Sequence, residues 1–402
     1  MRVAFLVPAL DQYGGVGVVM GHARRLRARH GIDAALVCTR ADRSSGRYAE
    51  GIGDVPVLEL DGARADRFDV AVATWWETTL HLHDVRADRY AYFVQSMEDR
   101  FYPAGAPEAA AAAMTHDLPV AMITEARWIA RQLEALRSEA AGFRVHYVRN
   151  GIDKSVFSTP DAVAPNVDGP LRILVEGSPA VAFKGVGEAL AAAAGMEMAH
   201  HVTLVCADRA AVGDAAAVAA DEVVGPLSAA QMAALYARTD VVLKLSRVEG
   251  MAGPPLEGFH RGATCVTTPV TGHDEYIADG INALVTSWDD ERGTARLLDL
   301  LARDRRLLHE LRGAALRTAR AWPSTDQSTA MMALALGRIA AAPSPDPTGA
   351  AAGMAADVRT TMQRHQAAQR EHERLAARMR RVESLLSRGP LKVVRRAVAG
   401  RR

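Results

Sequence analysis

Short apolar runs alternate with longer amphipathic stretches from the first residues of the chain, and this alternation constrains the fold more than any other feature. Helical patterns, for example at 16–30 and 125–140, separate several of the apolar runs. Continuous apolar runs are typical of parallel strands that are buried on both faces. The pattern therefore predicts an α/β fold with a doubly wound parallel sheet. The expected strands are residues 2–8, 33–38, 69–73, 90–94 and 119–124.

The same alternation begins again after a segment rich in proline, glycine and aspartate, so we expect two α/β domains. A helix at 324–341 is expected to close the globular part by returning toward the N-terminal domain. The predicted organisation is an N-terminal domain at 1–157, a linker at 158–169, a C-terminal domain at 170–323, the closing helix, a second linker at 342–353 and a basic helical tail at 354–402.

Composition excludes several classes of protein. The 402 residues are 49% hydrophobic and 24% charged, which is ordinary for a folded globular chain. The three cysteines lie far apart in sequence, which excludes a disulfide framework and a Cys-x-x-Cys metal motif and favours a reducing compartment. No apolar run approaches the ~20 residues that span a bilayer. We therefore expect a cytoplasmic protein.

Charge is distributed unevenly along the chain. Residues 357–402 hold 13 Lys and Arg against 4 Asp and Glu, a net charge of +9, whereas the remainder carries −8. Leu375, Met379, Val382 and Leu386 follow a 4-3-4 spacing, which indicates a weak coiled-coil pattern. No aromatic residue follows Trp322, which argues against nucleic acid as the partner of the tail. We expect the tail to bind the anionic lipids of the inner leaflet of a membrane. Self-association through a coiled coil and a lone solvated helix are the alternatives.

The richest candidate site is the segment Ser246-Arg-Val-Glu-Gly-Met-Ala-Gly-Pro-Pro-Leu-Glu257, which directly follows an expected strand. Ligands bind at the carboxyl ends of the strands in open α/β sheets. Backbone N–H groups from Gly250 to Gly253 and the following helix N-terminus could hold phosphate, while Glu249 and Glu257 could bind hydroxyl groups. This combination suits a sugar nucleotide. Taken alone, two glutamates at this spacing are more often a helix cap and a solvated helix residue.

In its wider context the segment resembles retaining glycosyltransferases of family 4. Asn150-Gly-Ile-Asp153 with Phe157 is similar to the hinge motif of that family, and Lys184-Gly185 is similar to its Lys-Gly pair. The resemblance covers about residues 1–340 and includes Gly14-Gly15-Val16 after the first strand. The matching positions of the central motif are Ser246, Glu249, Gly250, Pro254, Glu257, Gly262, Gly272, Glu275, Asp279, Gly280 and Asn282.

The resemblance implies a GT-B fold, in which two Rossmann-like domains face each other across a cleft. It implies catalytic roles for Glu249, which would contact donor-sugar hydroxyls, and for Lys184, which would neutralise the donor diphosphate. The other residues expected to bind the donor are Gly250, Met251, Ala252, Gly253, Glu257, Ser178 and Arg247. Those expected on the acceptor side of the cleft are Gly14, Gly15, Val16, Trp75, Trp76, Gln95 and Glu98.

Two departures from the family pattern affect these expectations. Relatives often carry an arginine about five residues before the lysine, where this chain has Ser178 or Pro179. The diphosphate charge would then rest on Lys184, backbone amides and Arg247. The block at 92–103, YFVQSMEDRFYP, resembles a subgroup that includes rhamnosyltransferases of bacterial surface glycans, which makes dTDP-rhamnose the first-ranked donor.

The expected function is a retaining, metal-independent transfer of sugar from a nucleotide-diphosphate donor to a glycan or lipid-linked acceptor. His81-x-His83 with Asp84 is a weak metal candidate, and the chain contains no Asp-x-Asp motif, so we expect no metal cofactor. The alternatives are another GT-B enzyme such as a sugar-nucleotide epimerase, and a membrane-associated scaffold that has lost turnover. Donor hydrolysis would separate the scaffold from the enzyme.

Overall fold

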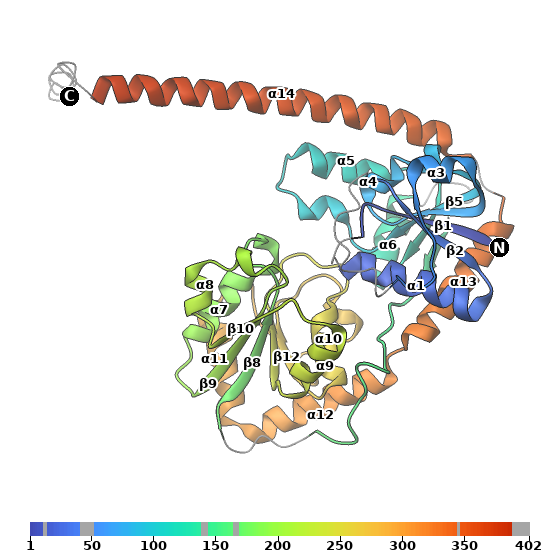
Figure 1. Cartoon of the computed structure of the whole chain (residues 1–402). Coiled ribbons are helices and arrows are strands. Elements are labelled where there is room, and N and C mark those ends of the chain that lie inside the picture. Colours follow the sequence, from blue (N-terminus) through green and yellow to red (C-terminus); the bar gives the residue numbers. More distant parts are fainter. Residues whose placement is uncertain (11–13, 41–51, 138–143, 164–168, 344–345, 388–402) are drawn as a thin grey trace.

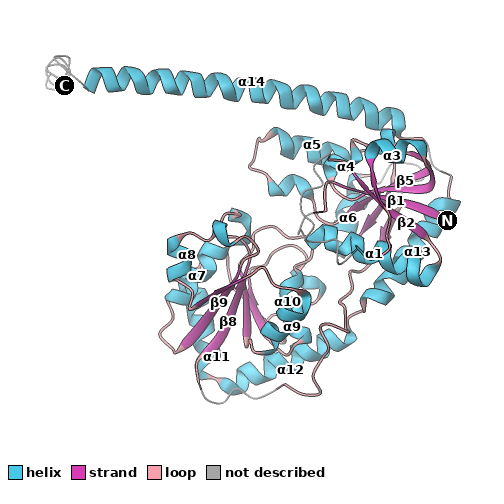
Figure 2. Ribbon diagram, viewed as in Figure 1, coloured by secondary structure: helices cyan, strands magenta, loops and turns pink. Residues whose placement is uncertain are grey.

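A computed structural model describes residues 1–10, 14–40, 52–137, 144–163, 169–343 and 346–387. Figure 1 shows two α/β domains beside each other and a long helix that projects from the N-terminal one. Each domain contains a single parallel sheet between layers of helices (Figure 2). The predicted pair of doubly wound α/β domains is therefore confirmed.

The N-terminal sheet has seven strands in the order β3-β2-β1-β4-β5-β6-β7, and all pairings are parallel. Order 3-2-1-4-5-6-7 reverses direction at β1, so the loops after β1 and β4 diverge at the carboxyl edge and leave space for a ligand. The strands are β1 (Arg2–Val7), β2 (Asp33–Cys38), β3 (Val57–Glu59), β4 (Arg67–Ala73), β5 (Arg86–Val94), β6 (Ala121–Thr124) and β7 (Val145–Tyr147).

Helices cover both faces of this sheet. On one face, α1 packs beside α13, and the two helices bury Leu26 and Leu336 against strand residues such as Phe5. On the other face, α6 buries Ile129 and Leu133. The helices of this domain are α1 (Gly14–His30), α3 (Leu60–Ala65), α4 (Trp76–Thr79), η1 (Leu82–Asp84), η2 (Glu98–Phe101), α5 (Pro107–Thr115), α6 (Arg127–Leu136) and α13 (Thr325–Ala341).

The C-terminal sheet has six parallel strands in the order β10-β9-β8-β11-β12-β13. Apolar residues of α7 and α11 cover one face, and those of α9, α10 and α12 cover the other. The strands are β8 (Leu171–Glu176), β9 (His200–Val205), β10 (Glu222–Val224), β11 (Val241–Lys244), β12 (Thr264–Thr267) and β13 (Leu284–Val285). The helices are η3 (Ala182–Lys184), α7 (Val186–Ala194), η4 (Arg209–Ala211), α8 (Asp214–Val218), α9 (Ala229–Ala237), α10 (Gly253–His260), η5 (His273–Glu275), α11 (Glu291–Arg303) and α12 (Arg305–Ala321).

The chain returns to the N-terminal domain through α13. Ser324 and Gln327 form a capping box at its start, which satisfies two backbone N–H groups that the first helical turn leaves free. Just before it, the backbone of Ser324 pairs with Ile152, which lies in the predicted hinge motif. A Cβ on the neighbouring Gly151 would lie 2.3 Å from the Ser324 carbonyl oxygen, so glycine allows the two crossing segments to touch.

The last described helix, α14 (Thr348–Ser387), has a start that differs from the one expected from the sequence. The helix begins at Thr348, inside the segment expected to be a linker at 342–353. Ala351 and Ala355 are fully buried, and Val358 packs with Trp76 and Ala112 of the N-terminal domain. The small apolar residues in the supposed linker therefore form a helix that packs on α5. Beyond about residue 366 the helix leaves the body and is exposed (Figure 1).

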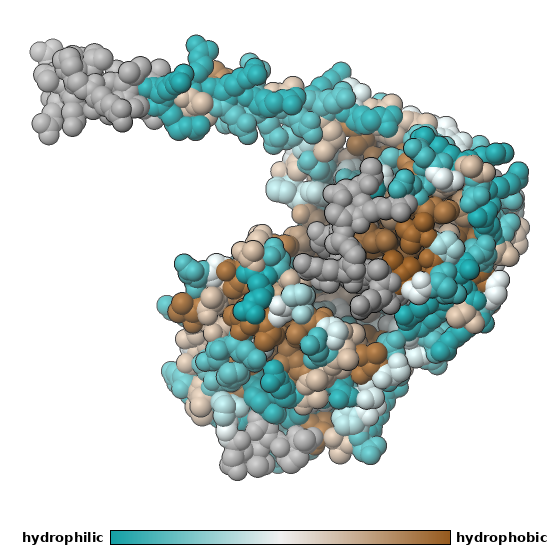
Figure 3. All heavy atoms as spheres, in the orientation of Figure 1, coloured by the Kyte–Doolittle hydropathy of each residue, from teal (hydrophilic) through white to brown (hydrophobic). Residues whose placement is uncertain are grey.

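Figure 3 shows that the surface is hollowed between the two domains and that the projecting part of α14 is mainly hydrophilic. Leu375 and Met379 of the predicted coiled-coil stripe are more than half exposed there. The side chains of Val382 and Leu386, and residues 388–402, lie outside the described part of the chain. Within the described residues, no helix combines the length and apolar character needed to cross a membrane.

Candidate active site

The centre of the site is an ion pair between Lys184 and Glu249. The Lys184 Nζ atom lies 2.9 Å from Glu249 Oε1 and 3.1 Å from Oε2. Lys184 ends the short helix η3, and Gly185 follows with a φ of +64°, where a Cβ would lie 2.0 Å from the Leu245 carbonyl oxygen. Glycine at 185 therefore allows the η3 turn to touch the carboxyl end of β11. This contact brings together the two residues that the sequence predicted as catalytic.

Two further charged side chains lie next to this pair. Lys244, the last residue of β11, and Glu176, the last residue of β8, are neighbours because Leu243 pairs with Val175 in the sheet. The Lys244 Nζ atom lies 2.7 Å from Glu176 Oε2 and 3.7 Å from Glu249 Oε1. Burial opposes the charge of Lys244, but the carboxylates of Glu176 and Glu249 outweigh that effect and raise its pKa. The sequence analysis did not predict either residue, although both end strands at the expected ligand-binding edge.

Glu257 lies one helical turn into α10, the helix that starts at Gly253 with prolines at its first positions. Burial and the nearby charge of Glu176 raise the pKa of Glu257 to about 7. Before the helix, Met251 and Ala252 are buried, and the Ala252 carbonyl accepts a hydrogen bond from Tyr276. This part of the predicted donor loop is thus held in place by the body of the C-terminal domain.

The N-terminal domain contacts the donor loop directly. A Cβ on Gly250 would lie 1.8 Å from the Gln95 carbonyl oxygen, and a Cβ on Gly15 would lie 3.1 Å from the Gln95 side-chain nitrogen. Trp128 Nε1 also donates a hydrogen bond of 2.7 Å to the Gly250 carbonyl. The predicted residues Gly15, Gln95, Gly250, Glu249 and Lys184 therefore belong to one continuous region between the domains.

Other contacts join the domains around this region. Arg100 Nη1 donates to the Thr271 hydroxyl at 2.8 Å, and the Tyr147 hydroxyl donates to Glu275 Oε2 at 3.1 Å. The rings of Phe101 and Phe183 lie 5.2 Å apart, next to Lys184. The described structure thus has the two domains in contact at the loops that carry the residues predicted as catalytic.

Glu125 is a residue of this region that the sequence analysis missed. It follows β6 directly, is 6% exposed, and its Oε2 atom has no hydrogen-bond partner in the described part of the chain. Burial and the like charge of Glu249 raise the pKa of Glu125 to about 8. The only sequence signal was its position immediately after a strand of the N-terminal domain.

Several predicted residues lie away from the ion pair. Glu98 is 1% exposed and accepts hydrogen bonds from the Tyr92 hydroxyl at 2.9 Å and from the Trp76 backbone N–H, so its carboxyl group faces the interior of its domain. Trp76 is 3% exposed and packs with Tyr102. Both residues were expected to line the acceptor side of the cleft, and the structure places them in the core because the loop after β4 folds over η2.

The remaining predicted positions have different surroundings. Arg247 forms ion pairs with Asp289 and Glu188 rather than with the Glu249 cluster. Ser178 accepts a hydrogen bond from the Ala180 N–H within the turn after β8.

On the N-terminal domain, Trp75 stacks on Phe101 with ring centroids 5.9 Å apart. A Cβ on Gly14, near Val16 in α1, would meet open space. His81 and His83 contact Asp84, and the described residues contain no group of three His, Cys, Asp or Glu suited to a metal ion.

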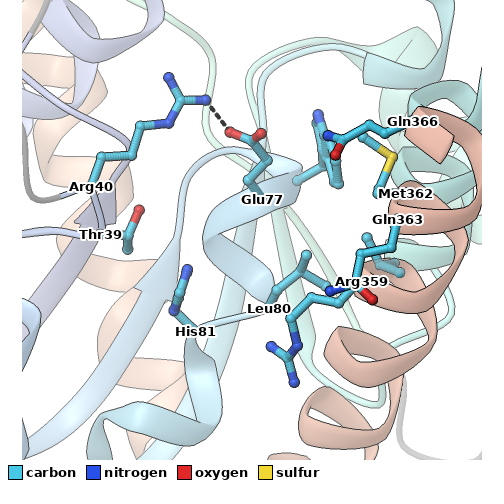
Figure 4. A pocket seen from close by; sticks show the side chains of 11 residues that line it. Thr39, Arg40, Glu77, Leu80, His81, Arg359, Met362, Gln363 and Gln366 are labelled. Carbon is cyan, nitrogen blue, oxygen red and sulfur yellow. Dashed lines mark hydrogen bonds and ion pairs between the residues drawn. The ribbon is translucent and has the colours of Figure 1, made fainter. Parts of the chain in front are cut away.

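A separate pocket of about 350 Å³ lies between the N-terminal domain and α14 (Figure 4). Its walls include Arg40 after β2, Glu77 and His81 near α4, and Arg359 and Gln363 from α14. Arg40 forms an ion pair with Glu77 at its edge. Because β2 and β4 end at the same edge of the sheet as β1 and β5, the pocket lies at the carboxyl edge of the N-terminal sheet.

Comparison with known proteins shows which proteins this chain is similar to. Residues 171–304, which include Lys184, Glu249 and Glu257, match the family model described as "Glycosyl transferases group 1". The crystal structure of HepE from Anabaena in complex with UDP and glucose is similar over 84% of this chain and 100% of that chain, with 14% identity and a TM-score of 0.67. WaaG, a glycosyltransferase of lipopolysaccharide biosynthesis, is similar over 85% and 100% of the two chains, with 16% identity and a TM-score of 0.62.

The structural similarity shows the GT-B fold, and within it residues 171–304 of the C-terminal domain are similar to the glycosyl transferases of group 1. Among curated proteins, the O-antigen biosynthesis protein RfbC of Myxococcus xanthus is 27% identical over 317 residues, which is 74% of this chain. The chain spans 24% of the length of that relative. The predicted GT-B fold is confirmed.

Proposed function

We propose that this protein transfers a sugar, with retention of anomeric configuration, from a nucleotide-diphosphate donor to a glycan or lipid-linked acceptor of a bacterial surface polysaccharide. The observation that carries the proposal is the Lys184–Glu249 pair at the carboxyl edge of the C-terminal sheet, opposite Gly15 and Gln95 of the N-terminal domain. A cation and a carboxylate at this edge supply the two kinds of contact that a sugar diphosphate needs.

The chemistry of each group fits this role. A departing nucleoside diphosphate gains negative charge as the glycosidic bond breaks, and the Lys184 ammonium group can stabilise that charge. Glu249 can accept hydrogen bonds from the donor-sugar hydroxyls, and Glu257 can do the same for the ribose. The loop of Gly250 to Gly253 offers backbone N–H groups at the start of α10.

We favour a front-face mechanism without a metal ion. In it, the leaving phosphate accepts the proton of the acceptor hydroxyl while the closed domains exclude water from the oxocarbenium-like transition state. The close contact of Gly250 with Gln95 supports such a closed site. EDTA is expected to leave turnover unchanged.

The donor and the acceptor are proposed from relatives. HepE was crystallised with UDP and glucose, which supports a nucleotide sugar as the donor class. The similarity to RfbC supports a role in O-antigen-type glycan synthesis. Within this class, dTDP-rhamnose is the first donor to test because of the resemblance of the block at 92–103. The pocket between Arg40 and Arg359 offers a further contact for an extended acceptor on the same edge of the N-terminal sheet.

The tail is proposed to bring the enzyme to its acceptor. Lipid-linked acceptors lie at the cytoplasmic face of the inner membrane, and the net charge of +9 in residues 357–402 would attract anionic lipid there. Self-association of the exposed stripe with Leu375 and Met379 is the alternative role.

The proposal is tested with purified protein. UDP-, GDP-, dTDP- and ADP-sugars are screened by thermal shift and by donor hydrolysis, since a ligand at 100 Kd stabilises a protein by ~2.7 kcal/mol. Glu249→Gln is expected to lower the turnover of the best donor at least 100-fold, because Glu249 contacts the sugar on which the transition-state charge develops. Normal turnover in a folded E249Q protein, or no stabilisation by any of these donors, would overturn the proposal.

A further inference from the structure

Two lysines share the carboxylate of Glu249, and they differ in their freedom to move. Lys184 lies on the short helix η3, and its side chain is 30% exposed. Lys244 lies within β11, and its side chain is 1% exposed. The first can therefore change partners at little cost, whereas the second is fixed by the sheet.

Lys244 has an anchor that is independent of Glu249. Its ammonium group donates to Glu176 Oε2 at 2.7 Å and to the Glu176 backbone carbonyl at 3.1 Å. A buried ammonium group without such partners would cost several kcal/mol of desolvation. The contacts with Glu176 thus offset the desolvation cost of burying Lys244. The Lys244 Nζ atom remains 3.7 Å from Glu249 Oε1.

The proposed function creates a conflict for Lys184, and the inference rests on that function. If Lys184 neutralises the donor diphosphate, it must give up the contacts of 2.9 and 3.1 Å that it makes with Glu249. Glu249 would then lose its closest cation at the moment when it has to bind the donor sugar. A carboxylate that is 12% exposed needs another partner to keep its charge and its orientation.

We propose that Lys244 is a positioning residue that holds Glu249 when the donor diphosphate draws Lys184 away. Donor binding is then an exchange of ion pairs: Lys184 moves from Glu249 to the diphosphate, and Glu249 closes on Lys244. Glu176 keeps Lys244 in place throughout. The exchange couples occupation of the diphosphate site to the orientation of the sugar-binding carboxylate.

The exchange predicts that the effects of the Glu249 and Lys244 variants on the affinity for a nucleoside diphosphate do not add. The probe is whichever of UDP, GDP, dTDP and ADP stabilises the wild-type protein most. Glu249→Gln removes the pair that must break, so it should tighten binding of this probe about 3- to 10-fold. The double variant E176Q/K244M removes the fixed partner at constant net charge, so Glu249 should retain Lys184 more firmly and binding should weaken about 3- to 10-fold.

The triple variant E176Q/K244M/E249Q tests whether Lys244 affects probe binding through Glu249. Because the effect of Lys244 acts through Glu249, the triple variant should bind the probe as tightly as E249Q alone. Turnover of the best donor should fall at least 10-fold in E176Q/K244M. Lys154→Met is the matched control, since the half-buried Lys154 donates a hydrogen bond to the Arg320 carbonyl and does not belong to the cluster around Glu249.

The outcomes separate this inference from the proposed function. If E176Q/K244M weakens probe binding equally in the presence of Glu249 and in the E249Q background, Lys244 has a merely structural role. That result would overturn the inference and leave the proposed function standing. Unchanged probe affinity and turnover in the folded E176Q/K244M protein would overturn it as well. If the wild-type protein binds none of the four diphosphates and none of their sugars, both the proposed function and the inference fail.

Discussion

Gly250 of the C-terminal domain lies against Gln95 of the N-terminal domain so closely that a Cβ on Gly250 would be 1.8 Å from the Gln95 carbonyl oxygen. The contact joins the loop that carries Glu249 to the end of β5. On its other side, Trp128 donates a hydrogen bond to the Gly250 carbonyl. Residue 250 therefore sets how closely the two halves of the site can approach.

Gly250→Ala should hold the domains apart at this point, because the added methyl group meets backbone rather than a side chain that could move. We expect sugar transfer to fall at least 10-fold, while nucleotide binding to the C-terminal domain changes by less than 3-fold. Steady-state kinetics and thermal shift measure the two effects. Gly187→Ala in α7 is the control, since a Cβ there meets open space. Transfer at the wild-type rate in G250A would show that catalysis does not need this contact.

Buried carboxyl groups predict that stability falls as pH rises from 6.5 to 8. Burial raises the pKa of Glu98 to about 8 and, with the charge of Glu249, that of Glu125 to about 8 as well. Between the unfolded value of about 4.5 and these folded values, the native state binds more protons than the unfolded state, so ionisation favours unfolding. The lowered pKa values of His22 and His260, both about 4 mainly because of burial, oppose this trend near the unfolded histidine value of about 6.5, and their effect fades above pH 7.

Glu98→Gln keeps an acceptor for the Trp76 N–H and removes the titration. Urea unfolding at pH 6.5, 7, 7.5 and 8 should show a slope that is flatter than that of the wild type by up to about 1.4 kcal/mol per pH unit. Exposed Glu59→Gln is the control. Identical slopes in E98Q and the wild type would mean that Glu98 ionises freely in the native protein.

The sequence predicted the fold and singled out both residues of the central ion pair for identifiable reasons, although it did not predict that they contact each other. Buried parallel strands form continuous apolar runs, and those runs were read correctly at β1, β2 and β4. Lys184 and Glu249 each lie in a motif with glycine beside it, where the backbone must approach another segment. Such motifs are local, so a linear pattern can reveal them.

The residues that the sequence missed depend on register and burial. Lys244 meets Glu176 only because β8 and β11 are neighbours with Leu243 opposite Val175. Glu98 was expected on the acceptor side of the cleft, yet the structure folds it into the core onto Tyr92. Likewise, Ala351 lies in the predicted linker and Ala355 at the start of the predicted tail, and only their packing shows that both belong with the N-terminal domain.

Glu257→Gln should remove a pH dependence of nucleotide binding. Burial and the charge of Glu176 raise the pKa of Glu257 to about 7, so its carboxyl group ionises between pH 6 and 8. Ribose hydroxyls donate hydrogen bonds more strongly to the ionised form, so affinity for the nucleoside diphosphate should rise with pH over this range. Calorimetric titrations at several pH values should show this rise, about 3- to 10-fold, in the wild type and its loss in E257Q. Gln231→Glu, at the exposed start of α9, provides a control that alters a surface position.

The function of the tail is tested by two truncations rather than one. Removing 343–402 takes away Ala351, Ala355 and Val358, which are buried against the N-terminal domain, and uncovers Trp76. Because burial of one large apolar side chain stabilises a protein by roughly 1.5–3 kcal/mol, this truncation should lower Tm by several degrees or more. Removing only 369–402 starts where α14 is exposed, so it should leave Tm and donor hydrolysis unchanged.

The shorter truncation isolates the membrane interaction. The full chain should co-sediment with liposomes that contain anionic phosphatidylglycerol at low salt, and less at high salt, because each basic residue near the surface contributes about 1 kcal/mol. The protein without 369–402 should stay in the supernatant under both conditions. Liposomes of phosphatidylcholine alone control for binding that is independent of charge. If the full chain ignores the anionic liposomes but is dimeric by light scattering, and the truncated chain is monomeric, then the exposed stripe of Leu375 and Met379 serves self-association instead.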